Sequence, residues 1–294
     1  DRIALNCNIM PQDIIAAPDA DSIYEVPINF EKEKLGNRIL DKFELTSKKR
    51  DLTEWTRYVR RIRRAEKPVN IAIIGKYFDT GDFTLSDSYL SVIEALKHAS
   101  WHFRRKPILT WLSAEEYERK PAKLKGLSRF DGIVVPGGFG ARGIDGKIKA
   151  IGYARTKKIP FLGLCYGLQL AVIEFARHVS GLKGADTTEI DPNTKHPVIH
   201  TMPDQLLLIK EKRLGGSMRL GAYSCDLAKE SISFRAYGTA SISERHRHRY
   251  ELNNAYRASL ENGGLVIAGV NPERDLVEII EIKKHPFFVG TQFH

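Results

Sequence analysis

The segment IPFLGLCYGLQLAVIEFAR, residues 159–177, decides the fold because it joins a buried strand to an amphipathic helix through a single cysteine. Residues 159–165 are apolar enough for a strand buried on both faces, and apolar residues recur at helical spacing over 166–179. Gly163 and Gly167 flank Cys165 in the thiol version of the G-x-S-x-G nucleophile elbow, where glycines permit a sharp turn. A helix N-terminus lowers the pKa of a nearby thiol, so Cys165 is predicted to be an exposed, activated nucleophile. The alternative is a small buried core cysteine.

Strand-like and helix-like segments alternate on either side of this turn. Strands are predicted over 69–75, 106–112 and 131–138, and helices over 86–103, capped by Ser86 or Asp87, and 145–158. The alternation predicts an α/β fold, with a flavodoxin-like, mostly parallel sheet flanked by helices. Active sites in such sheets gather at the carboxyl ends of the strands.

The two ends of the chain have different patterns. Beyond residue 180 the pattern predicts an added β-rich portion of short strands, at 196–202, 206–213, 216–223, 241–253, 263–270, 276–284 and 287–293. Near the start, residues 21–27 are predicted to be extended and 31–64 mostly helical. A domain boundary is expected near Lys67–Pro68, because proline disfavours helix at the residue before it.

Composition excludes several classes of protein. The chain is 42% hydrophobic and 28% charged, which is typical of a globular protein with a real core. Its three cysteines, Cys7, Cys165 and Cys225, have no spacing suited to a disulfide framework or a zinc site. No signal peptide and no membrane-spanning run are visible, which favours a cytoplasmic location without membrane contact.

The net charge of +10 is concentrated in one segment. Residues 48–67 hold nine Lys/Arg against three Asp/Glu, which accounts for +6 of the total. No aromatic stacking platform accompanies these charges, so a solvated helical connector is favoured over a nucleic-acid surface.

If Cys165 attacks a carbonyl group in an acyl-transfer reaction, the carbonyl oxygen becomes negatively charged and needs hydrogen-bond donors. The segment PGGFG, residues 136–140, ends a neighbouring strand, so the backbone amides of Gly138 and Tyr166 are the predicted donors. Gly138 to Gly143 also fits the dinucleotide pattern G-x-G-x-x-G. A dinucleotide site would require an acidic residue at the end of the next strand, and residues 159–165 contain none.

A general base is the remaining requirement. His294 follows the apolar strand 287–293 and could face the elbow from a sheet end. A carboxylate is expected to orient its imidazole.

At this point the sequence resembles a known family. The segments FLGLCYGLQLAVIEFAR, VVPGGFGARG, GGSMRLG, SERHRHRYELN and HPFFVGTQFH resemble the glutaminase domain of the CTP synthases, which are class I glutamine amidotransferases. The resemblance covers nearly all of 68–294. DRIALNCNI and DSIYEVP are similar to the closing segments of that family's synthetase domain, and DLTEWTRYVRRI to its connector helix. The implied domains are therefore a synthetase remnant with connector at 1–66 and a glutaminase domain at 67–294.

The resemblance implies a role for each matching position. Cys165 would be the nucleophile and His294 its base. The implied glutamine-binding residues are Gly138, Tyr166, Gly167, Leu168, Gln169, Glu189 and Arg249. Glu189 and Arg249 would hold the ammonium and the carboxylate of the substrate, since charge-assisted pairs suit the two ends of a free amino acid. Without the resemblance, RHRHRYELN would be interpreted as a charged edge strand.

The resemblance also implies an activity and its partners. L-glutamine would be hydrolysed through a cysteine thioester, and the ammonia would serve the ATP-dependent amination of UTP to CTP. The glutaminase half would need no cofactor and no metal; ATP and magnesium would act in the synthetase half, GTP would be an allosteric activator, and the enzyme would be a cytoplasmic homotetramer. The sequence contains no Walker-type loop, so the ATP and UTP sites are expected elsewhere.

The sequence departs from the family in three places. The family usually has Leu-Gly-Met-Gln where residues 166–169 are Tyr-Gly-Leu-Gln, and the stretch between Pro203 and Gly215 is shorter. The orienting glutamate of the family lies two residues beyond the histidine, so its counterpart is expected after His294, and the 294-residue chain alone is expected to hydrolyse glutamine poorly. Two alternatives remain open here: the glutaminase of another amidotransferase, and a non-enzymatic basic module that binds nucleic acid or acts as a scaffold.

Overall fold

The structure is a computed structural model that describes residues 2–46, 50–75, 89–138, 140–201 and 218–294. The chain divides into two compact units, one of residues 1–68 with 97–106 and one of 69–96 with 107–294. The predicted helix start at Ser86 or Asp87 and the predicted strand at 206–213 lie outside the described residues.

The first unit is helical. Its elements are α1 (Arg2–Cys7), η1 (Pro11–Asp13), η2 (Ile23–Glu25), α2 (Val26–Lys32), α3 (Leu35–Lys42) and α4 (Thr53–Arg63). Aromatic rings hold it together: the Tyr24 ring lies 5.9 Å from that of Trp55 and 5.5 Å from that of Trp101. The predicted helical character of 31–64 is confirmed in α2, α3 and α4.

The prediction that residues 21–27 are extended was wrong, because η2 and the start of α2 occupy them. The Ser22 hydroxyl accepts a hydrogen bond from the backbone N–H of Tyr24 at 3.3 Å, which caps the turn. Pro27 lies in the first turn of α2, where its missing N–H has no helical partner to lose. The signals for a helix start were therefore present in the sequence, next to the β-prone residues Ile23, Tyr24 and Val26.

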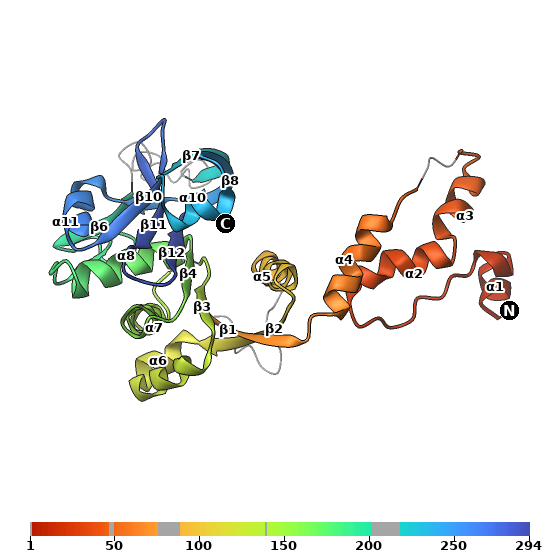
Figure 1. Ribbon diagram of the computed structural model, residues 1–294, viewed down its shortest axis with the longest axis horizontal. Coiled ribbons are helices and arrows are strands. Elements are labelled where there is room, and N and C mark those ends of the chain that lie inside the picture. The colour runs from red at the N-terminus through yellow and green to blue at the C-terminus, as the bar shows by residue number, and fades with distance from the viewer. Residues whose placement is uncertain (1, 47–49, 76–88, 139, 202–217) are drawn as a thin grey trace. The chain divides into compact units, whose positions relative to one another are not determined.

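The second unit is built on one large sheet (Figure 1). Its strands are β1 (Lys67–Gly75), β2 (Arg105–Ser113), β3 (Gly132–Val135), β4 (Phe161–Leu164), β7 (Arg219–Leu227), β8 (Ser241–His248), β10 (Leu265–Asn271), β11 (Leu276–Ile282) and β12 (Phe288–Thr291). They lie in the order β2-β1-β3-β4-β12-β11-β10-β7-β8. A smaller sheet contains β5 (Ala185–Thr187), β6 (His196–Thr201) and β9 (Tyr250–Leu252).

The large sheet changes character at β12. Strand β3 pairs in parallel with β1 and β4, and β4 pairs in parallel with β12, whereas β11, β10, β7 and β8 continue the sheet in antiparallel pairings. The α/β class is confirmed, and most of the added β-rich portion proves to be the antiparallel continuation of the parallel strands. Figure 1 shows β12, at the blue end of the chain, directly beside β4 in the green.

Helices cover the parallel part of the sheet. They are α5 (Leu90–His102), α6 (Ala114–Arg119), the 3-10 segment η4 (Pro121–Arg129), α7 (Ile144–Lys157) and α8 (Tyr166–His178); α10 (Ile232–Tyr237), η6 (Asn254–Tyr256) and α11 (Arg257–Asn262) follow later in the chain. The main core includes Ile151 of α7, Leu168 of α8, and Phe161 and Phe288, whose rings stack at 4.5 Å across β4 and β12. The two strands that converge on the elbow are thereby locked side by side.

Candidate active site

Cys165 occupies the turn between β4 and α8 in a strained conformation. Its φ is 52° and its ψ is −101°, values that non-glycine residues rarely adopt and that occur where the surrounding structure enforces them. A Cβ atom at Gly163 would lie 2.7 Å from the backbone of Gly167, and one at Gly167 would lie 2.1 Å from the carbonyl oxygen of Val135. Only glycine fits at either position, so the G-x-C-x-G pattern reflects close packing of α8 on β3 and β4.

The thiol itself is more buried than the sequence predicted. Cys165 is 3% exposed, and burial raises the pKa of its thiol to about 12. A hydrogen bond from the Tyr166 backbone and one from Gln292 lower the pKa, but they do not outweigh burial and the added effects of Glu251 and then Glu189. The expectation of an exposed thiol with a depressed pKa was therefore wrong, because burial dominates over the helix N-terminus.

His294 lies beside the nucleophile. A Cβ atom at Gly137 would be 3.0 Å from Cε1 of His294 and 3.5 Å from Cβ of Cys165, so the two side chains converge on one glycine. Burial first, then the charges of Arg245 and His248, lower the pKa of His294. A lowered pKa keeps the imidazole neutral near pH 7, the state that a general base requires.

The predicted oxyanion donors follow two neighbouring strands. Gly138 lies three residues after the end of β3, and Tyr166 is the first residue of α8, with its backbone N–H directed to the thiol. The neighbouring Phe139 lies outside the described residues. Both positions remain predicted donors.

The residues after the nucleophile face the protein interior. Leu168 is fully buried in the main core, and Gln169 is 3% exposed. The Gln169 side chain donates from Nε2 to the carbonyl oxygen of Tyr250 at 2.8 Å and to Oε1 of Gln292 at 3.1 Å. Their assignment to the glutamine pocket remains a prediction, as does that of Gly167, whose Cα faces Val135.

The two predicted anchors for the substrate ends lie on separate elements. Glu189 follows β5, and its Oε1 accepts a hydrogen bond from the N–H of Gly140 at 3.2 Å. Its charge contributes to the raised pKa of Cys165, which places it in electrostatic reach of the thiol. Arg249 is half-buried and lies between the last residue of β8 and the first of β9.

Sequence reasoning missed Gln292. Its Nε2 donates to the Cys165 sulfur at 3.7 Å, and its Oε1 accepts from Gln169. Nothing in the local pattern marks it, because its role depends on β12 lying beside β4. The signal in the sequence that could have drawn attention to it is a polar residue directly after an apolar strand.

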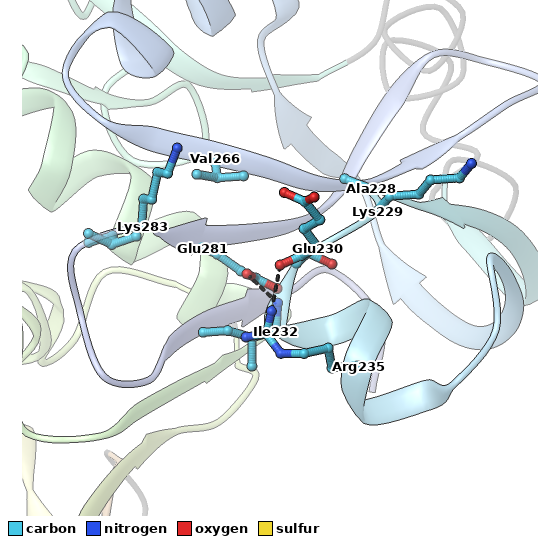
Figure 2. Close-up of a pocket in the computed structure, with 10 residues that line it drawn as sticks. Ala228, Lys229, Glu230, Ile232, Arg235, Val266, Glu281 and Lys283 are labelled. Atoms are coloured by element: carbon cyan, nitrogen blue, oxygen red, sulfur yellow. Dashed lines mark hydrogen bonds between the residues drawn. The ribbon is translucent and has the colours of Figure 1, made fainter.

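A separate pocket of about 310 Å³ lies between α10 and strands β10 and β11 (Figure 2). Its lining includes Lys229, Arg235 and Lys283 together with Glu281, but none of the residues predicted from the sequence. The Glu281 carboxylate accepts hydrogen bonds from the N–H groups of Ile232 and Ser233 at 2.8 Å each, and so it caps α10. This wall of the pocket therefore has a structural function.

Within the residues that the structure describes, no group of three or more His, Cys, Asp or Glu side chains is arranged to hold a metal ion. The helices in that part of the chain are too short or too polar to cross a bilayer.

Comparison with known proteins identifies the family. Residues 84–294 match the model of the class I glutamine amidotransferases. The CTP synthase of Caldanaerobacter subterraneus is 50% identical over 296 residues and that of Geobacillus kaustophilus 47% identical over 295; both alignments cover 100% of this chain, but 53% and 54% of the relatives. The chain thus spans about half the length of the curated relatives it matches.

A solved structure matches most of the chain. The glutaminase domain of the Trypanosoma brucei CTP synthase, with bound acivicin, superposes with a TM-score of 0.69 and 36% identity, covering 77% of this chain and 85% of that one. The matching family model and these relatives agree with the strained cysteine elbow and the histidine beside it. The chain belongs to the class I glutamine amidotransferases and, among them, to the CTP synthase family.

Proposed function

We propose that the chain hydrolyses L-glutamine through a thioester on Cys165 and that it supplies the ammonia to the amination of UTP in a longer CTP synthase. The observation that carries the proposal is the convergence of Cys165, held in a strained turn, and His294 on Gly137. The Trypanosoma brucei relative supports the substrate class, because the acivicin bound to it is a glutamine analogue.

In the proposed reaction, His294 takes the proton from the Cys165 thiol as the sulfur attacks the side-chain amide carbon of glutamine. The backbone amides of Gly138 and Tyr166 donate to the oxygen, which carries the negative charge of the tetrahedral intermediate. The C–N bond breaks, His294 returns the proton, and ammonia leaves. Water, deprotonated by His294, then attacks the thioester and releases glutamate and the thiol.

The substrate is held at its two charged ends. Glu189 accepts hydrogen bonds from the α-ammonium, and the guanidinium of Arg249 donates to the α-carboxylate. These roles rest on the family resemblance. They are supported by the position of Glu189, whose charge acts on Cys165.

The remaining assignments concern the longer protein. ATP with magnesium would activate UTP in the synthetase half, GTP would stimulate glutamine hydrolysis, and the enzyme would act as a cytoplasmic homotetramer. The relatives of about twice this length, named CTP synthases, support the overall reaction. No metal or cofactor is proposed for the glutaminase half.

The test is glutamate release from L-glutamine by the protein expressed from its complete natural gene. Cys165→Ala is expected to abolish release, whereas Cys7→Ser, which changes an exposed thiol, is expected to retain it. Stimulation by UTP and ATP, with CTP as product, would distinguish this protein from another amidotransferase. Undiminished glutamate release by Cys165→Ala would overturn the proposal.

A further inference from the structure

A cluster of five buried charged and imidazole side chains includes residues on both sides of Arg249 in the sequence. We call it the buried clasp; its members are Arg219, His246, His248, Glu251 and Glu278, each no more than 2% exposed. Arg219 bridges the two glutamates, with Nη1 3.0 Å from Oε1 of Glu251 and Nη2 2.8 Å from Oε1 of Glu278. Each glutamate also bonds one histidine at 2.8 Å, Glu251 with His248 and Glu278 with His246.

The clasp surrounds a corner in the chain. Strand β8 ends at His248 in the nine-stranded sheet, and β9 begins at Tyr250 in the three-stranded sheet, so Arg249 is the single residue at which the chain changes sheets. The bond between His248 and Glu251 spans that corner. Arg219 on β7 and Glu278 on β11 hold it from two further strands of the large sheet.

The same corner is connected to the nucleophile. The carbonyl oxygen of Tyr250, the residue after Arg249, accepts from Nε2 of Gln169 at 2.8 Å. Gln169 bonds Gln292 at 3.1 Å, and Gln292 donates to the Cys165 sulfur at 3.7 Å. A continuous set of buried hydrogen bonds thus runs from the thiol to the backbone that presents Arg249.

Buried ions are an expensive way to stabilise a fold. Their desolvation often exceeds the attraction between them, and apolar residues of similar volume can serve stability as well or better. What fixed, charge-assisted bonds provide is a defined geometry, since the planar guanidinium fork of Arg219 accepts few arrangements of its two carboxylates. The clasp is therefore best explained by a geometric requirement at the corner that it holds.

We propose that the buried clasp is a positioning device: it fixes Arg249 relative to Cys165 and thereby sets the affinity of the site for the α-carboxylate of glutamine. This proposal rests on the proposed function, in which Arg249 binds that carboxylate. The clasp residues act through Arg249 and do not touch the substrate.

Glu278→Gln is the most informative variant. Glutamine has the shape of glutamate but cannot satisfy Arg219 and His246 as a charged acceptor. Glu251 is less suitable, because its charge also raises the pKa of Cys165. The matched control is Glu281→Gln, on the same strand β11, where the buried carboxylate caps α10 instead.

In the protein from the complete gene, Glu278→Gln is expected to lower kcat/KM for L-glutamine about ten- to a hundredfold, the range for a misplacement of up to 1 Å. The loss should appear mainly in KM. It should also largely remove the preference for L-glutamine over its α-carboxamide, as is expected of Arg249→Ala, because that preference reports the contact with the carboxylate. Glu281→Gln is expected to stay within twofold of the unsubstituted enzyme.

The double variant Glu278→Gln with Arg249→Ala decides whether the clasp acts through Arg249. Little further loss beyond Arg249→Ala alone is expected. A second, equally large loss, or a Glu278→Gln enzyme with an unchanged preference, would overturn the proposal. If thermal unfolding shows that Glu278→Gln does not fold, His246→Asn breaks the same carboxylate's second bond and is subject to the same criteria.

A binding measurement separates this proposal from the proposed function. Calorimetry of L-glutamine with the Cys165→Ala protein is expected to give a Kd that Glu278→Gln raises at least tenfold. The protein with Cys165 intact could release no glutamate while Glu278→Gln still weakens the binding of L-glutamine to the Cys165→Ala protein. That outcome would refute hydrolysis but support the clasp. An unchanged Kd would refute the clasp, whatever the activity.

Discussion

Gly137→Ala provides a direct test of the pairing between Cys165 and His294. Gly137 does not adopt a positive φ, so alanine suits its backbone, but the added methyl would lie 3.0 Å from Cε1 of His294 and 3.5 Å from Cβ of Cys165. The imidazole must therefore shift by about 0.5 Å to reach normal van der Waals separation. A misplacement of 1 Å costs on the order of 10²-fold in rate, so about tenfold is expected here, with complete loss of the base setting a ceiling of about 10²–10⁴-fold.

The assay is kcat/KM for glutamate release, measured alongside thermal unfolding. Replacing a glycine whose backbone suits alanine stabilises the fold by about 0.4–1 kcal/mol, because the unfolded chain has fewer conformations. This gain offsets the cost of the close contact between the new methyl and His294, so the free energy of unfolding should change by less than about 1 kcal/mol. Gly126→Ala is the matched control, because its methyl would meet no atom within 4 Å and it is not among the proposed site residues. Full activity in Gly137→Ala, or an equal loss in Gly126→Ala, would refute the pairing.

Four further predictions address the thiol, the two anchors and the base. A chloroketone built on glutamine is expected to label Cys165 and neither of the other two cysteines; peptide mapping that finds the label elsewhere would contradict the assignment. In the longer protein, Arg249→Ala should lower kcat/KM for glutamine by tens- to thousands-fold, because losing one partner of a charge pair costs about 2–5 kcal/mol. CTP formation from free ammonia should stay within twofold. Equal losses with both nitrogen donors would indicate a structural role. Glu189→Gln should slow glutamine hydrolysis yet accelerate alkylation of Cys165 by iodoacetamide at pH 8, because it removes a charge that raises the thiol pKa; slower alkylation would sink this prediction. The acid limb of kcat/KM should report protonation of His294 with a midpoint below 6.5, the usual histidine value, because the pKa of His294 is lowered, and a midpoint above 6.5 would indicate a different base.

The elbow could be predicted because all of its determinants are local. Gly163 and Gly167 stand where no Cβ fits, and a change from strand to helix period surrounds them, so a few residues specify both the turn and the nucleophile. The class of the fold followed from the same alternation. His294 could be predicted as the base for a related reason, because it follows an apolar strand. Its approach to Gly137, however, depends on the pairing of β12 with β4.

What could not be predicted is what depends on partners distant in the sequence. The RHRHR segment has the alternation of a charged edge strand, and β8 does lie at the edge of the sheet, yet His246 and His248 are buried. Their imidazoles point inward because each bonds a buried carboxylate. His246 bonds Glu278, 32 residues away along the chain, and His248 bonds Glu251, three residues away. The raised pKa of Cys165 was missed similarly: the helix N-terminus is visible in the sequence, but the degree of burial is not.

The opposite effects expected of Glu189→Gln arise from one electrostatic arrangement. Burial is the main reason that the thiol of Cys165 has a pKa of about 12, and the charges of Glu251 and Glu189 raise it further. In the proposed function, the ammonium of glutamine would pair with Glu189 and would offset that contribution when the amide carbon lies beside the sulfur. A permanently ionised thiol would need an exposed, electropositive surrounding, which would also leave it open to oxidation and stray alkylation. The buried thiol, whose pKa is raised, is therefore expected to stay protonated until the α-ammonium of glutamine pairs with Glu189, so the glutamate that is proposed to bind the substrate would also restrain the nucleophile.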